Sequence, residues 1–132
     1  MAAMDAVPLR KLALFAGLSE EERQQVARRA EEVEVPVHKR LVDEGDLGYE
    51  FFVIQEGRAE VRRGEEVIAE LGPGDFFGEV ALLEEHRRNA SVIAAEPLRA
   101  IVMTRRDFVE MQAEMPSVAA LIRQAVEDRR AS

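Results

Sequence analysis

The spacing of hydrophobic and polar residues changes period twice along the chain. Leu18, Val26 and Ala30 recur at a spacing that places them on one face of a helix. Ser19, followed three residues later by Glu22, forms a capping-box pattern at the start of this stretch. We therefore predict a helix of about three turns inside an N-terminal helical segment over residues 8–31.

From Val33 onward the pattern is that of strands. VEVPV alternates hydrophobic and polar residues, FFVIQEG is a short hydrophobic run that ends at a turn, and AEVRRGEEVIAEL predicts two strands folded about Gly64. ASVIAAEPLRAIVM predicts two further strands interrupted near Pro97. Short strands separated by regularly spaced glycines are typical of a sandwich or barrel, so we predict a β-barrel over residues 33–104.

Helical patterns return at the end of the chain, over residues 105–130. Thr104 and Asp107 form a second capping-box pattern, and Pro116 suits the first turn of a further helix. A chain of 132 residues buries one sizeable core rather than two. We predict a single, mainly β domain over residues 1–132 with helices at both ends.

Composition narrows the functional classes. The formal net charge of −8 argues against general affinity for nucleic acid, which depends on Lys and Arg neutralising phosphates. The chain has no cysteine, so disulfides, thiolate metal sites and cysteine nucleophiles are excluded. No stretch approaches the roughly 18 apolar residues that a membrane span requires. These features predict a soluble, cytoplasmic protein without a membrane partner.

Candidate catalytic chemistry is sparse. His38 and His86 are the only two histidines, and neither belongs to a metal-binding motif. Carboxylates occur mainly in runs such as Glu20–Glu22, which are typical of a solvated face. We therefore expect no metal, no cofactor and no enzymatic activity, and we disfavour a small metal-dependent barrel enzyme.

One segment, FFGEVALLEEHRRNASV (residues 76–92), combines an apolar pattern with a glycine, a glutamate and two adjacent arginines. Hydrophobic packing would require only the apolar residues. A short helix predicted to begin at Gly78 would present free N–H groups to an anion, and glycine allows a ligand to approach the backbone closely. Glu79 has two interpretations: an acid favoured by the helix dipole, or an acceptor for a ribose hydroxyl. Arg88 would supply a planar guanidinium for a phosphate.

This segment resembles the phosphate-binding cassette of cyclic-nucleotide-binding domains, with a pattern of roughly F-G-E-x-A-L-L followed by R-x-A-S/T-V. The resemblance extends over almost the whole chain, through LFAGLSEEE, EGD, EGRAEV and LGPGDFFGE. It implies a jelly-roll β-barrel with flanking helices that binds cyclic AMP or cyclic GMP. The residues it places at the ligand are Val61, Leu71, Gly78, Glu79, Val80, Ala81, Arg88, Asn89 and Ser91.

The resemblance also implies roles for these residues. The backbone at Gly78 and Ala81 would lie near the cyclic phosphate, Glu79 would hold the ribose 2′-hydroxyl, and Arg88 would pair with the phosphate. Asn89 would add a backbone or side-chain contact. The apolar base pocket would be lined by the strand residues Val61 and Leu71.

Two positions in the cassette allow more than one interpretation of their role. Of the two adjacent arginines, Arg88 rather than Arg87 is expected to face the ligand, because it stands two residues before Ala90 and consecutive strand residues face opposite ways. Ser91 has two interpretations: a contact to the base that bears on the choice between cyclic AMP and cyclic GMP, or a plain polar strand residue. We favour cyclic AMP.

The C-terminal residues indicate which macromolecular partners the chain could bind. Transcription regulators of this family continue into a helix-turn-helix domain, whereas this sequence stops at Ser132, so no DNA binding is expected. Val118, Leu121, Ile122, Ala125 and Val126 form a hydrophobic stripe that would carry the signal to an unidentified protein partner or to a second copy. The alternatives are a degenerate barrel that serves as an interaction scaffold, and a fragment of a longer transcription regulator.

Overall fold

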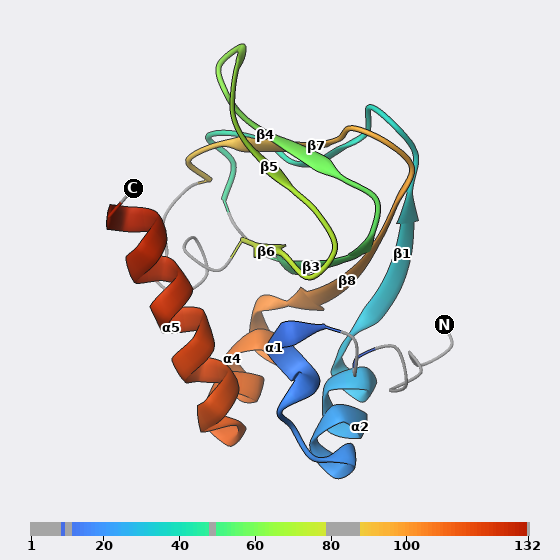
Figure 1. Ribbon diagram of the computed structural model, residues 1–132, viewed down its shortest axis with the longest axis vertical. Coiled ribbons are helices and arrows are strands. Elements are labelled where there is room, and N and C mark those ends of the chain that lie inside the picture. Colours follow the sequence, from blue (N-terminus) through green and yellow to red (C-terminus); the bar gives the residue numbers. More distant parts are fainter. Residues whose placement is uncertain (1–8, 10–11, 48–49, 79–87, 132) are drawn as a thin grey trace.

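A computed structural model describes residue 9 and residues 12–47, 50–78 and 88–131 of the chain. Within this part, the strands form two antiparallel four-stranded sheets, in the orders β1-β8-β3-β6 and β2-β7-β4-β5 (Figure 1). The strands are β1 (Glu31–Val35), β2 (Arg40–Val42), β3 (Glu50–Glu56), β4 (Ala59–Arg63), β5 (Glu66–Leu71), β6 (Phe76–Phe77), β7 (Ser91–Ala94) and β8 (Leu98–Thr104). The mainly β architecture predicted from the sequence is confirmed.

Helices flank the sheets at both ends of the chain. They are α1 (Ala13–Ala16), α2 (Glu20–Arg29), α4 (Arg105–Glu114) and α5 (Pro116–Ala131). Figure 1 shows α1, α2 and α4 grouped at one end of the barrel, with α5 running from that group along its side. None of the helices in the described part of the chain is long and apolar enough to cross a membrane.

The helix boundaries follow the predicted signals. Ser19 accepts a hydrogen bond from the Glu22 N–H (3.1 Å), while Glu22 Oε1 accepts one from the Ser19 N–H (3.0 Å), so the predicted capping box is present. Thr104 likewise caps α4 by accepting from the Asp107 N–H. Pro116 begins α5, where its missing N–H costs nothing.

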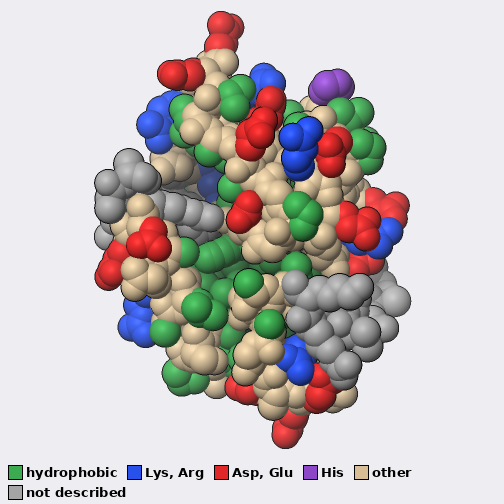
Figure 2. All heavy atoms as spheres, in the orientation of Figure 1, with side chains coloured by type: hydrophobic (Ala, Val, Ile, Leu, Met, Phe, Trp, Pro, Cys, Tyr) green, Lys and Arg blue, Asp and Glu red, His purple; other side chains and the backbone are tan. Residues whose placement is uncertain are grey.

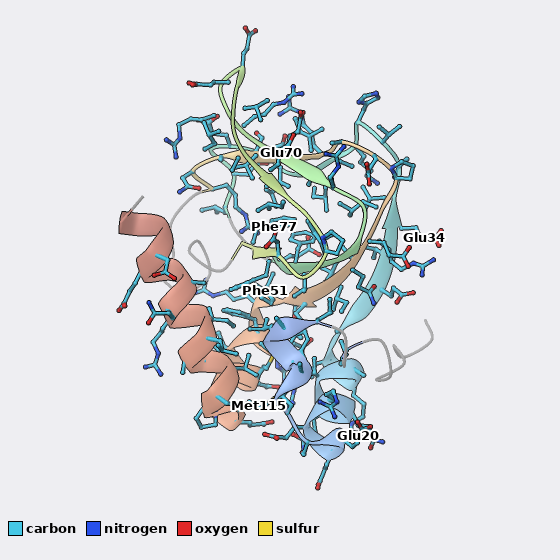
Figure 3. All side chains as sticks on the ribbon, viewed as in Figure 1. Glu20, Glu34, Phe51, Glu70, Phe77 and Met115 are labelled. Atoms are coloured by element: carbon cyan, nitrogen blue, oxygen red, sulfur yellow. The ribbon has the colours of Figure 1, made fainter. Side chains whose placement is uncertain are left out.

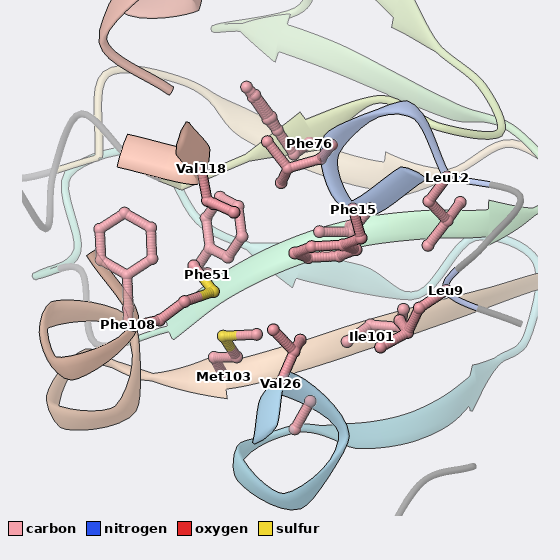
Figure 4. Packing of buried hydrophobic residues seen from close by; sticks show 14 of the residues in the cluster. Leu9, Leu12, Phe15, Val26, Phe51, Phe76, Ile101, Met103, Phe108 and Val118 are labelled. Atoms are coloured by element: carbon pink, nitrogen blue, oxygen red, sulfur yellow. The ribbon is translucent and has the colours of Figure 1, made fainter. Parts of the chain in front are cut away.

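The central strands β3 and β8 of the first sheet are buried on both faces. The run FFVI in β3 sends Phe52 and Ile54 into a cluster between the sheets, and Phe51 and Val53 into a second cluster beneath the helices. Hydrophobic residues therefore occupy consecutive positions, as expected for a strand covered on both sides. Figure 4 shows the second cluster, in which Phe51 lies close to Phe108 of α4, with ring centroids 4.6 Å apart.

Strand β6 connects both clusters to the start of the cassette. Phe76 packs in the cluster beneath the helices, whereas Phe77 stacks on Phe52 between the sheets, with ring centroids 4.7 Å apart. Because adjacent strand residues point to opposite faces, this two-residue strand anchors the chain in both cores. The position of Gly78, the next residue, is thereby fixed relative to both sheets.

The barrel begins slightly earlier than predicted. Strand β1 starts at Glu31 instead of Val33, because Glu31 and Glu32 pair with Val102 and Ile101 of β8. Both glutamates are exposed, so the hydrophobic pattern alone did not reveal them as strand residues. The pairing partner lies about 70 residues away in sequence, beyond the reach of a local pattern.

Candidate functional site

The structure describes six of the nine residues that the sequence placed at a ligand site. Gly78 follows β6, Arg88 and Asn89 precede β7, Ser91 begins β7, and Val61 and Leu71 lie on β4 and β5. The other three, Glu79, Val80 and Ala81, fall outside the described residues, as does Arg87. Their predicted roles and the predicted short helix stay predictions.

Gly78 has a backbone conformation that requires glycine. Its φ angle is 97°, in a region of backbone conformation that residues with a side chain rarely adopt. A Cβ atom at this position would lie 2.7 Å from the Glu50 carbonyl oxygen and 2.8 Å from an Arg88 guanidinium nitrogen. The glycine therefore permits the close approach of the cassette start to β3 and to Arg88.

Arg88 is buried beside this glycine, with 7% of its surface exposed. One of its terminal guanidinium nitrogens (Nη1) donates to the Gly78 carbonyl oxygen at 3.0 Å, and the other (Nη2) donates to the Glu50 carbonyl oxygen at 2.6 Å. Charged side chains are rarely buried to this degree unless they have partners. The structure thus holds a positive charge at the point where the cassette begins, next to Gly78.

The backbone of Arg88 is held as firmly as its side chain. Its N–H donates to the Asp46 carbonyl oxygen at 2.7 Å, and its carbonyl oxygen accepts from the Gly45 N–H at 2.9 Å. Gly45 has a φ angle of 89°, which turns the chain back toward Arg88. The sequence alone does not reveal this contribution of the β2–β3 turn, although its EGD stretch resembles the family pattern.

Val61 and Leu71 line the barrel interior. Both are partly buried and pack against the cluster between the sheets. Val61 pairs with Val92 of β7 on one side and with Ala69 of β5 on the other, so these side chains share one face of the sheet. The result is an apolar wall of small side chains, suited to a flat apolar group.

The view in Figure 2 shows a hollow near the centre of this face, where hydrophobic side chains are visible. In the same orientation, Figure 3 shows Phe77 above Phe51 in the view. Phe77 belongs to the cluster between the sheets and Phe51 to the cluster beneath the helices. The two phenylalanines therefore mark the two clusters in this view.

Ser91 is directed away from that wall. It pairs with Arg62, while its neighbour Val92 packs in the cluster between the sheets, so the Ser91 side chain lies on the opposite face of the sheet. Its hydroxyl accepts from the Glu44 N–H at 2.9 Å and from Arg40 at 3.4 Å, and the residue is 5% exposed. This geometry favours the interpretation of Ser91 as a polar strand residue over a contact to the base.

Asn89 presents a different environment. It is exposed, and its carbonyl oxygen accepts from the Arg63 side chain at 3.3 Å. An exposed amide next to Arg88 is compatible with the polar contact that the resemblance implied.

Among the residues that the structure describes, no group of three or more His, Asp or Glu side chains is arranged to hold a metal ion. His38 lies at an exposed turn with a φ angle of 73°, and His86 is outside the described residues.

Comparison with known proteins identifies the relatives of this arrangement. Residues 32–115 match the family profile described as "Cyclic nucleotide-binding domain". The chain is 40% identical over 107 residues to a cAMP-dependent protein kinase regulatory subunit of Mycosarcoma maydis, with 74% of this chain and 20% of the relative covered. It is 32% identical over 111 residues to the Cyclic AMP receptor protein of Thermus thermophilus, with 80% of this chain and 51% of the relative covered.

A solved structure has the same fold. The regulatory domain of Toxoplasma gondii PKA, in a co-crystal with cAMP, superposes with a TM-score of 0.79 at 26% identity, covering 92% of this chain and 48% of that one. The jelly-roll fold expected from the sequence is therefore confirmed. The chain spans between a fifth and about half of the length of the two curated relatives.

Proposed function

Because the chain belongs to the cyclic nucleotide-binding domain family, we propose that it is a regulatory module that binds cyclic AMP and signals through its C-terminal helix. The observation that carries the ligand proposal is Arg88, a buried guanidinium that donates to the Gly78 carbonyl oxygen. A guanidinium and a glycine backbone side by side suit a cyclic phosphate, which offers two unesterified oxygens to a planar fork. The chain itself is proposed to have no catalytic role.

The proposed ligand pose follows from the two sides of the site. The phosphate lies at Gly78 and Arg88, and the base lies against the apolar wall that includes Val61 and Leu71. The ribose then falls between them, where Glu79 is proposed to accept a hydrogen bond from the 2′-hydroxyl. Asn89 adds a polar contact at the exposed side of Arg88.

Cyclic AMP is proposed over cyclic GMP on two grounds. The names of the two curated relatives refer to cyclic AMP, and the Toxoplasma gondii structure is a co-crystal with cyclic AMP. In addition, the Ser91 hydroxyl accepts a hydrogen bond from the Glu44 N–H and does not face the apolar wall.

The proposed signalling route passes through Phe76. This residue stands two positions before Gly78 and packs in the same cluster as Val118 and Ile122 of α5. A ligand that displaces the chain at Gly78 would alter the packing of Phe76 and therefore the stability of α5. Leu121, on the same helix, is 51% exposed and is proposed to face a protein partner or a second copy.

Hydrogen exchange with and without cyclic AMP tests both parts of this proposal. We expect slower exchange on ligand binding at residues 88–91 and a change in exchange along α5. A response confined to residues 88–91 would support binding but refute α5 as the output. Unchanged exchange in both regions at saturating cyclic AMP would refute the proposed function.

A scaffold role without ligand remains the alternative, because one fold supports several functions. No described residue favours it over binding. Binding is preferred because Arg88 places a guanidinium beside the glycine backbone at Gly78, an arrangement that suits a phosphate.

A further inference from the structure

The turn between β2 and β3 makes a continuous series of hydrogen bonds with residues 88–91. Gly45 and Asp46 bond to the backbone of Arg88 in both directions, at 2.9 and 2.7 Å. The preceding residue, Glu44, donates its N–H to the Ser91 hydroxyl at 2.9 Å. Three successive residues of the turn are therefore attached to the segment that carries the candidate phosphate-binding arginine.

Ser91 is the buried end of this series. The residue is 5% exposed, whereas Glu44, Gly45 and Asp46 are exposed. An exposed turn has many accessible conformations in water, so a hydrogen bond to a fixed strand residue restricts it substantially. The Ser91 hydroxyl supplies that fixed point, because it belongs to β7 and is held by pairing with β4.

The side chain of Glu44 extends the series to a third segment. Its carboxylate accepts from the Gly64 N–H at 2.8 Å, at the tip of the β4–β5 hairpin. The neighbouring Arg63 donates to the Asn89 carbonyl oxygen at 3.3 Å. The hairpin, the β2–β3 turn and the Arg88 segment are thus joined by polar contacts on the outer side of the barrel.

We propose that Ser91 and Glu44 are positioning residues that act on a cyclic nucleotide through Arg88 without touching it. Ser91 fixes the β2–β3 turn, the turn holds the Arg88 backbone in place, and Glu44 ties the turn to the hairpin that forms the apolar wall. The inference rests on the proposed function, since it deepens the role of the same site. It assigns Ser91 a function other than a contact to the base.

The matched pair Ser91→Thr and Ser91→Val tests this inference, because the two side chains share a shape and differ in the hydroxyl. We expect Ser91→Thr to retain the cyclic AMP affinity of the wild-type protein within about twofold, and Ser91→Val to lose about three- to tenfold, as expected for one hydrogen bond. In the ligand-free protein, Ser91→Val should also accelerate amide exchange at Glu44 and Arg88, whereas Ser91→Thr should not.

A double-mutant cycle with Arg88→Lys separates positioning from a general loss of stability. If Ser91 acts through Arg88, the valine substitution should cost markedly less affinity in the Arg88→Lys background than in the wild-type background. Equal losses in the two backgrounds would overturn the inference, as would equal affinities of the threonine and valine variants. A wild-type protein that binds no cyclic nucleotide would instead overturn the proposed function, and the inference with it.

Discussion

Replacing Arg88 with alanine should weaken cyclic AMP binding by about 30-fold to several thousand-fold, which corresponds to about 2–5 kcal/mol. The guanidinium is buried next to Gly78, so a phosphate placed there would pair with it away from bulk water. Titration of the purified variant by calorimetry measures the loss directly. Arg88→Lys should give an intermediate loss, because an ammonium keeps the charge but not the planar fork.

Two control variants sharpen this prediction. Arg106→Ala changes a side chain that is 87% exposed on α4, and its cyclic AMP affinity should match that of the wild-type protein. Arg87→Ala tests the choice between the adjacent arginines and should also have little effect. A loss in Arg87→Ala as large as that in Arg88→Ala would contradict the assignment. Because Arg88 also donates to two carbonyl oxygens, the fold of its variants must be checked by thermal unfolding.

The second large effect is expected from Gly78→Ala, which should lower the free energy of unfolding by about 2–4 kcal/mol. The residue has a φ angle of 97°, and the new Cβ atom would lie 2.7 Å from the Glu50 carbonyl oxygen. Either β6 or the start of β3 must move to relieve that contact, and both are anchored in the core by phenylalanines. Urea unfolding of both proteins measures the difference.

Gly74→Ala provides the matched control. Gly74 also has a positive φ angle, 91°, but a Cβ atom there would meet nothing within 4 Å. Its cost should therefore be limited to backbone strain, about 1–2 kcal/mol. Equal destabilisation by the two substitutions would mean that the close approach at Gly78 contributes nothing.

Local patterns in the sequence predicted those elements whose signals are themselves local. The capping residues Ser19 and Thr104 accept hydrogen bonds from residues three positions further along the chain, so their pattern is visible without knowledge of the fold. The hairpin about Gly64 is equally local, because β4 and β5 pair with each other. The short hydrophobic run in β3 is likewise visible in the local sequence, although its partner β8 is distant.

The sequence pattern did not predict the two shortest strands, β2 and β6. Strand β2 has three residues with an irregular pairing register, and β6 has two, so neither is long enough to show a period. Their strand character depends on partners far away in the sequence: β2 pairs with β7, and β6 with β3. The division of the core into two clusters was hidden for a related reason, since it depends on which face of each strand the helices cover.

The candidate site was predicted in part. The preference for Arg88 over Arg87 came from family spacing and strand alternation, and the buried guanidinium next to Gly78 supports it. The acceptors of Arg88 were not predictable, because Glu50 lies 38 residues earlier and offers only its carbonyl oxygen, which every residue type possesses. The partner of Ser91 was missed in the same way, since it is the backbone N–H of Glu44.

The measurement that tests the central claim most directly is a calorimetric titration of the wild-type protein with cyclic AMP, with cyclic GMP and 5′-AMP as comparison ligands. The account predicts saturable binding of cyclic AMP at one site per chain, weaker binding of cyclic GMP, and the weakest binding by 5′-AMP, whose open phosphate carries more charge and cannot adopt the cyclic geometry at Gly78 and Arg88. Absence of saturable binding by either cyclic nucleotide, in protein shown to be folded, would contradict the account.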